Sequence, residues 1–137
     1  MNKRVRQLWR IKNRRGAAIV EFALVVPILL LLLWGIVDIG RAFYTINNLA
    51  SAVREGARTA AVMPTDPTAG TNPATIKSTV TTAFRPIGPP LAPESVFVTL
   101  ANRQVTVKAS YPFAPLALVG WTFPVVRSAI FRWEQAP

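Results

Sequence analysis

The sequence contains no cysteine and no histidine. Without cysteine there is no disulfide framework, and without histidine the chain lacks the commonest general base and a very common metal ligand. Its six acidic residues are scattered, so that no two share a spacing that brings them together on one expected element. No glycine-rich phosphate loop follows an expected strand. The sequence therefore predicts no enzyme, and no cofactor, metal or small-molecule substrate.

Positive charge is unevenly distributed along the chain, whose net charge is +10. Seven of the sixteen basic residues precede Gly16, in a segment that holds no acidic residue. The rest of the chain carries nine basic and six acidic residues, which is an ordinary balance. A basic cluster beside an apolar run is typical of a segment retained in the cytoplasm, and it attracts anionic lipid headgroups. The overall basicity therefore does not indicate a nucleic-acid partner.

A long apolar segment follows, since residues 22–37 read FALVVPILLLLLWGIV and carry no charge. Together with residues 17–21 it reaches about twenty residues, enough for a helix to cross about 30 Å of hydrocarbon. The basic residues in front of it predict a cytoplasmic N-terminus and an extracytoplasmic C-terminal part. A cleaved secretory signal is the competing interpretation, but no Ala-x-Ala site follows the apolar run. We therefore expect a single-pass anchor in the cytoplasmic (inner) membrane.

Two residues of this segment are unusual for a membrane helix. Pro27 has no backbone N–H group and is expected to bend or loosen the helix. Glu21 is an acid whose ionised form costs several kcal/mol in hydrocarbon unless it finds a partner. Glu21 therefore either stays hydrated near the cytoplasmic headgroups or pairs with a cation, and acids in such positions are candidate functional residues.

The segment 14–27, RRGAAIVEFALVVP, resembles the processing region of the TadE-like family, the small pseudopilins of tight-adherence (Flp-type) pilus systems. The resemblance continues through GIVDIGRAFY at 35–44 and AVREGAR at 52–58, although Asp38 stands where many relatives carry glutamate. It implies that a membrane prepilin peptidase cuts between Gly16 and Ala17 on the cytoplasmic side. The new α-amino group would be a cation four residues ahead of Glu21. Pairing of these two groups between neighbouring subunits would set their register during assembly.

The resemblance implies a structural or assembly role, as a minor pilin that either enters the filament or stays in the membrane. The implied partners are the prepilin peptidase, other pilins and pilus assembly proteins, and membrane lipid. Two alternatives remain open at the level of the sequence. One is a permanently anchored extracytoplasmic binding module that never joins a filament, and the other is a secreted protein with a cleaved signal.

Apolar and small residues recur at alternating spacings of four and three beyond the membrane segment. This stripe consists of Ile39, Phe43, Ile46, Ala50, Val53 and Ala57. Because only two helix-weakening residues, Gly40 and Gly56, lie between the membrane segment and Met63-Pro64, we expect one helix over 17–62, about 70 Å long. The stripe packs either on a neighbouring helix or on the chain's own C-terminal domain.

A short helix and a small antiparallel sheet are expected in the C-terminal half. Asn72 and Pro73 mark a helix start, and Ile76, Val80 and Phe84 share one face of the helix. Alternating residues in 95–101 and 105–110 predict a hairpin with a turn at 102–103, and 125–133 is a further strand.

The apolar loop 112–124 covers the sheet edge, lies at the membrane surface or contacts a partner. The expected fold class is α+β and resembles the general pilin plan. Its organisation is described by five segments: a basic leader 1–16, a transmembrane helix 17–37, an extracytoplasmic helix extension 38–62, a linker 63–72 and a domain 73–137.

Overall fold

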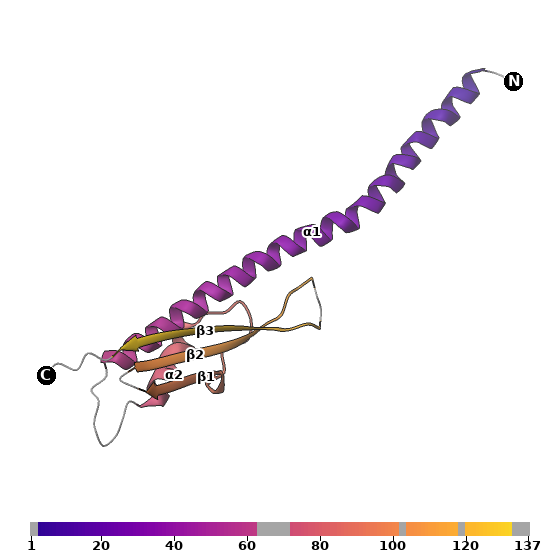
Figure 1. Cartoon of the computed structure of the whole chain (residues 1–137). Helices are drawn as coiled ribbons and strands as arrows, with labels where there is room; N and C mark the ends of the chain where they lie inside the picture. Colours follow the sequence, from indigo (N-terminus) through magenta and orange to yellow (C-terminus); the bar gives the residue numbers. More distant parts are fainter. Residues whose placement is uncertain (1–2, 63–71, 102–103, 118–119, 133–137) are drawn as a thin grey trace.

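One long helix dominates the molecule. The computed structural model describes residues 3–62, 72–101, 104–117 and 120–132, with side chains from Gly16 onward. Helix α1 (Lys3–Val62) stands alone in its N-terminal part and lies along a small domain in its C-terminal part (Figure 1). It ends at Val62 as expected but begins well before residue 17. The leader is helical because it contains neither glycine nor proline before Gly16 and is rich in good helix formers.

The free part of α1 is the candidate membrane span. Within Gly16–Val62 the most apolar window has a mean hydropathy of 2.6, and none of that window is buried inside the molecule. The helix continues through Pro27 without interruption. Figure 1 shows that the axis of α1 curves between its indigo and magenta ends.

The short helix α2 (Pro73–Ala83) begins as the sequence predicts. The side-chain oxygen of Asn72 accepts a hydrogen bond from the backbone N–H of Ala74 at 3.0 Å, and Pro73 occupies the first turn. This arrangement satisfies one of the free N–H groups at the helix start. Ile76 and Val80 are fully buried and Phe84 is nearly so, which confirms the apolar face of this helix. Most of the expected linker before Asn72 lies outside the described residues.

Three antiparallel strands form a sheet in the order β1-β2-β3. They are β1 (Val96–Ala101), β2 (Gln104–Phe113) and β3 (Phe123–Arg132), and a 3-10 turn at Pro93–Ser95 leads into β1. The register pairs Val98 with Val107 and Thr106 with Ile130. The α+β fold class and the predicted hairpin are confirmed, while the expected turn at 102–103 lies outside the described residues.

The core lies between the sheet and the two helices, which both pack on one face of it. Val105, Val107 and Ala109 on β2 are fully buried and meet Leu49 and Val53 of α1 in one cluster. The remaining buried members of this cluster are Ala52, Ala57, Ala60, Ile76, Val80, Phe84, Leu91, Val96 and Tyr111. The other face of the sheet exposes Phe97 and Ile130.

The loop between β2 and β3 is shorter than the sequence indicates. β2 extends through Phe113 and β3 starts at Phe123, so that Pro112 lies opposite Pro124 in the ladder. The expected boundaries of the loop at 112–124 were therefore wrong. Proline is tolerated near strand ends and on edge strands, and both prolines occupy such positions. In Figure 1 this hairpin projects along α1 toward its N-terminal part.

Candidate functional site

The three residues predicted to act in processing and assembly lie on the free part of α1. Gly16, Ala17 and Glu21 are all exposed. They belong to the N-terminal part of α1, which stands free of the domain (Figure 1). A Cβ atom added at Gly16 would meet no atom within 4 Å. At 1.5 Å per residue, Glu21 lies about 25 Å along the helix from Asp38, where contact with the domain begins.

Glu21 is an unpaired acid as far as the described side chains extend. Within that part of the chain, the ion pairs are Arg41 with Asp38 and Arg58 with Glu55, and no hydrogen bond reaches Glu21. The exposed residues around it are apolar, among them Ile19, Phe22 and Leu24. A partner for this carboxylate therefore has to come from outside the described residues.

The predicted helix stripe is divided between two environments. Ile39 and Phe43 are exposed to 60% and 63%, Ile46 and Ala50 are half-buried, and Val53 and Ala57 are fully buried. The face that packs on the domain is rotated relative to the stripe and runs through Asp38, Thr45, Leu49, Ala52, Gly56 and Ala60. Only the last residues of the stripe are thus brought together with the domain core.

Asp38 fastens the β2–β3 loop to α1. Its Oδ1 atom accepts a hydrogen bond from the N–H of Leu116 at 2.9 Å, and its Oδ2 atom accepts one from Ala117 at 2.7 Å. The Arg41 guanidinium lies 3.0 Å from the same carboxylate and 5.5 Å from the centre of the Phe113 ring. One carboxylate directly after the apolar run therefore joins the helix to a loop that follows it by 78 residues.

The bonding at this carboxylate favours its charged form. The N–H groups of Leu116 and Ala117 lower the pKa of Asp38, and Arg41 lowers it further against the opposing effect of desolvation. A lowered pKa in the folded protein means that the carboxylate stabilises the fold above the unfolded-state pKa of about 3.9. This stabilisation is lost as the pH falls through the lower pKa of the folded state.

Removing this carboxylate by Asp38→Ala is expected to release the loop. The N–H groups of Leu116 and Ala117 then lose their acceptors, and their hydrogen-exchange protection factors should fall by roughly tenfold. The wild-type protein should show the same fall as the pH drops through the lowered pKa of Asp38 in the folded state, whereas Asp38→Ala should show none. Glu55→Ala, an exposed acid of the same helix, is the control. Equal protection in wild type and Asp38→Ala would mean that other contacts hold the loop.

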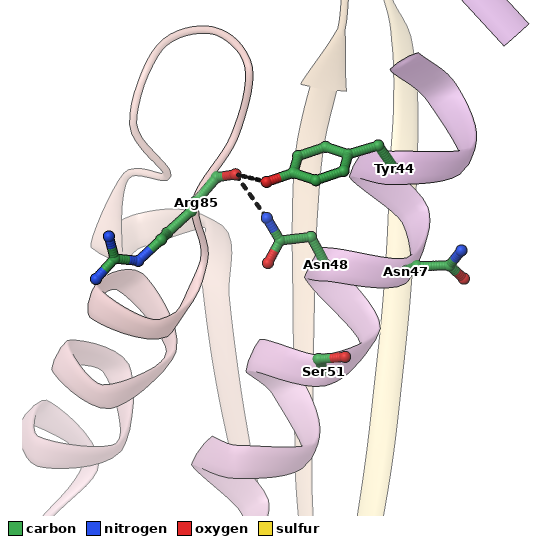
Figure 2. A pocket seen from close by; sticks show the side chains of 5 residues that line it. All are labelled: Tyr44, Asn47, Asn48, Ser51 and Arg85. Carbon is green, nitrogen blue, oxygen red and sulfur yellow. Dashed lines mark hydrogen bonds between the residues drawn. The ribbon is translucent and has the colours of Figure 1, made fainter. Parts of the chain in front are cut away.

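A second attachment lies about two turns further along α1. The Tyr44 hydroxyl and the Asn48 amide both donate to the backbone carbonyl of Arg85, at 3.2 and 2.5 Å (Figure 2). These groups, with Asn47 and Ser51, line a shallow cavity of about 340 Å³. In Figure 2 the Arg85 side chain points away from α1. The polar groups here hold the segment after α2.

The third contact is a close approach of the two helices. Gly56 is buried, and an added Cβ would overlap Cγ2 of Val80 on α2. On the opposite side of α1, Glu55 and Arg58 form an exposed pair at 4.0 Å, as their spacing predicts. Gly56 is therefore a packing residue, whereas Glu55 and Arg58 form a solvated pair.

Tyr111 completes the packing near the Asp38 end. Its ring meets Phe84 edge to face at 4.9 Å, and its hydroxyl donates to the carbonyl of Pro89 at 3.0 Å. Burial raises the pKa of Tyr111, so that the hydroxyl remains a donor at neutral pH. Throughout the described residues there is no group of three or more acids that could hold a metal ion.

The attachments at Asp38 and Arg85 are missing from the sequence interpretation. In the sequence Asp38 stood out only as the acid found where many relatives carry glutamate. Its backbone partners are 78 and 79 residues away in the sequence. A periodicity argument works within one element, so it finds neither a backbone partner in a distant loop nor the carbonyl that Tyr44 and Asn48 share. The one available signal was an acid placed beside a membrane segment.

The part of the chain that the structure describes thus contains one candidate membrane helix, α1, whose N-terminal half is free and whose C-terminal half packs along a small α+β domain. Residues 16–58 match the family model described as TadE-like protein. The resemblance found in the sequence is thereby confirmed for this segment. The matched segment includes Gly16, Glu21 and Asp38. Neither a curated protein nor a solved structure matches the chain.

Proposed function

We propose that this chain is a minor pilin or pseudopilin of a tight-adherence pilus, anchored in the membrane by residues 17–37 and matured by a prepilin peptidase. Its role is structural: it is a substrate of the peptidase, binds other pilins and assembly proteins, and catalyses nothing itself. The basic leader remains in the cytoplasm and the domain lies outside. The matched family model supports the pilus association. The long helix α1, with its free apolar part, supports the anchoring in a membrane.

The observation that carries this proposal is the free half of α1. Large apolar side chains from Ile19 to Val37 are exposed on all sides of the helix, and none of the most apolar window is buried. In water such a surface would aggregate, so it requires lipid or neighbouring apolar helices around it. A helix that is uniformly apolar around its circumference can exchange lipid contacts for contacts with neighbouring subunits.

Glu21 favours contact with a neighbouring subunit over contact with lipid, because a subunit can supply a cation. Cleavage after Gly16 would leave the Ala17 α-amino group about 6 Å along the helix axis from Glu21. A neighbouring subunit shifted along the axis by about one helical turn would bring its own α-amino group level with this Glu21. In low-dielectric surroundings an ion pair between subunits is favoured over two unpaired charges. The exposed Glu21 is therefore available for a subunit that brings its own α-amino group.

Intact mass of the full chain tests processing. The protein extracted from membranes of cells with the prepilin peptidase should start at Ala17, and from cells without it at Met1. Gly16→Leu should block this cleavage almost completely. Since a Cβ atom added at residue 16 would meet nothing within 4 Å beyond the helix's own backbone, we expect this variant to leave the fold intact. Gly35→Leu is the matched control, because residue 35 has the same open surroundings on the same helix.

The remaining outcomes of this experiment contradict the proposal. A chain that starts at Met1 in both strains would identify the protein as the permanently anchored binding module. A start beyond Gly40 in both strains is a secreted protein with a cleaved signal. Normal processing of Gly16→Leu would place the scissile bond elsewhere.

A further inference from the structure

The tip of the β2–β3 hairpin exposes apolar side chains beside the end of the membrane helix. Leu116, Trp121 and Phe123 are 54%, 65% and 45% exposed. The whole segment 112–124 carries no charged residue. Nothing in the described domain covers these side chains, although they include two aromatic rings. Such a group of exposed apolar residues indicates a surface with a partner.

The position of this tip along α1 is fixed by the Asp38 carboxylate. Leu116 and Ala117 donate to it at 2.9 and 2.7 Å, so this part of the tip lies beside residue 38. Phe113, at the base of the tip, is buried and lies under the Arg41 guanidinium at 5.5 Å. Figure 1 shows the hairpin running along α1 toward its free part, so that the tip is the part of the sheet nearest to the candidate span.

Asp38 is also the first residue after the uncharged run. If residues 17–37 fill about 30 Å of hydrocarbon, Asp38 lies at its outer boundary, and so does the tip that it holds. The surrounding phase at this level is the headgroup region. Tryptophan is enriched there, since its ring is apolar while its N–H group still finds hydrogen-bond acceptors. Because the tip is uncharged, entering this region desolvates no ion.

We propose that the β2–β3 tip, through Leu116, Trp121 and Phe123, is a second membrane contact that inserts into the outer headgroup region of the phospholipid bilayer. The domain then touches the membrane at two points, the helix and the hairpin tip, and Asp38 joins them. Its orientation on the membrane is fixed by these two points. This inference rests on the proposed anchoring by residues 17–37.

Tryptophan fluorescence of the full chain in vesicles of phosphatidylcholine and phosphatidylglycerol tests this contact. A variant that keeps only Trp121 carries the substitutions Trp9→Phe, Trp34→Phe and Trp133→Phe. Lipids brominated near the headgroup should quench its emission by roughly twofold, and more than lipids brominated deep in the acyl chain. The control replaces Trp121 by phenylalanine as well and carries Phe97→Trp, since Phe97 is similarly exposed on β1. It should show no bromolipid quenching and full quenching by aqueous acrylamide.

A third variant, which keeps only Trp34, reports on the anchor itself. Quenching of Trp34 without quenching of Trp121 overturns the tip contact and leaves the proposed anchoring intact. Loss of quenching at both positions overturns the anchoring together with the tip contact. A further outcome is that Trp121 is protected from acrylamide but is not quenched by bromolipid, and that this protection increases with the protein-to-lipid ratio. In that case a second copy of the chain covers the tip, and the assignment to lipid is wrong.

Discussion

Replacing Glu21 by glutamine is expected to abolish pilus assembly while leaving leader removal largely intact. The substitution keeps the shape of the side chain and removes only its charge. The α-amino group of a neighbouring subunit then loses its partner in surroundings of low dielectric. Breaking one member of such a pair costs about 3 kcal/mol, which weakens subunit association by roughly a hundredfold. Filaments sheared from cells and counted by electron microscopy measure the effect, and intact mass of the membrane-extracted chain measures cleavage.

Two variants control this experiment. Glu21→Asp keeps the charge on a shorter side chain and should retain more assembly than Glu21→Gln. Glu94→Gln removes an exposed acid of the domain and should assemble as wild type does. Normal filament numbers from a correctly cleaved Glu21→Gln chain would remove the role that we assign to this carboxylate.

Placing a methyl group at Gly56 is expected to destabilise the domain, although alanine is the better helix former. Exchange of an exposed helical glycine for alanine stabilises by about 1 kcal/mol. At Gly56 the new Cβ overlaps Cγ2 of Val80, which is fully buried and β-branched and therefore has few alternative rotamers. The two helices have to separate, and such overpacking costs about 1–3 kcal/mol. Hydrogen exchange of the β2 amides in detergent-solubilised full chain should accelerate about fivefold to a hundredfold.

The contact with Val80 can be isolated by a double-mutant cycle. In the Val80→Ala background the overlapping methyl group is absent, so Gly56→Ala should cost much less there than in the wild type. Gly40→Ala is the matched control on the same helix, since a Cβ at residue 40 meets nothing within 4 Å. It should leave exchange of β2 unchanged or slow it. Equal effects of Gly56→Ala in both backgrounds would exclude the clash as the cause.

The elements of this fold follow from local sequence signals. The cap at Asn72, the spacing of Ile76 and Val80 and the alternation through Val105 and Val107 each depend on a few neighbouring residues. These signals therefore predict the short helix and the hairpin. The end of α1 at Val62 follows in the same way from the proline that comes two residues later.

The face of α1 that packs on the domain was not predictable in the same manner. A spacing of three and four selects Ile39 and Phe43, yet these side chains are exposed, and the packing face at this level runs through Asp38 and Thr45 instead. Two polar residues occupy that face because Asp38 binds backbone N–H groups of a loop and Thr45 bonds to the carbonyl of Arg41. A search for apolar residues passes over both. The candidate assembly residues, in contrast, came from a motif and needed no tertiary structure.

The candidate span and the domain share one uninterrupted helix, with no glycine-proline hinge between residues 37 and 38. The domain contacts that helix from Asp38 to Ala60, so we expect it to turn together with this part of α1. The docked part is about 33 Å long, so a tilt of the anchor by about 20° would displace its far end by about 11 Å. A movement of the anchor helix would therefore be transmitted through the continuous helix to the far end of the domain.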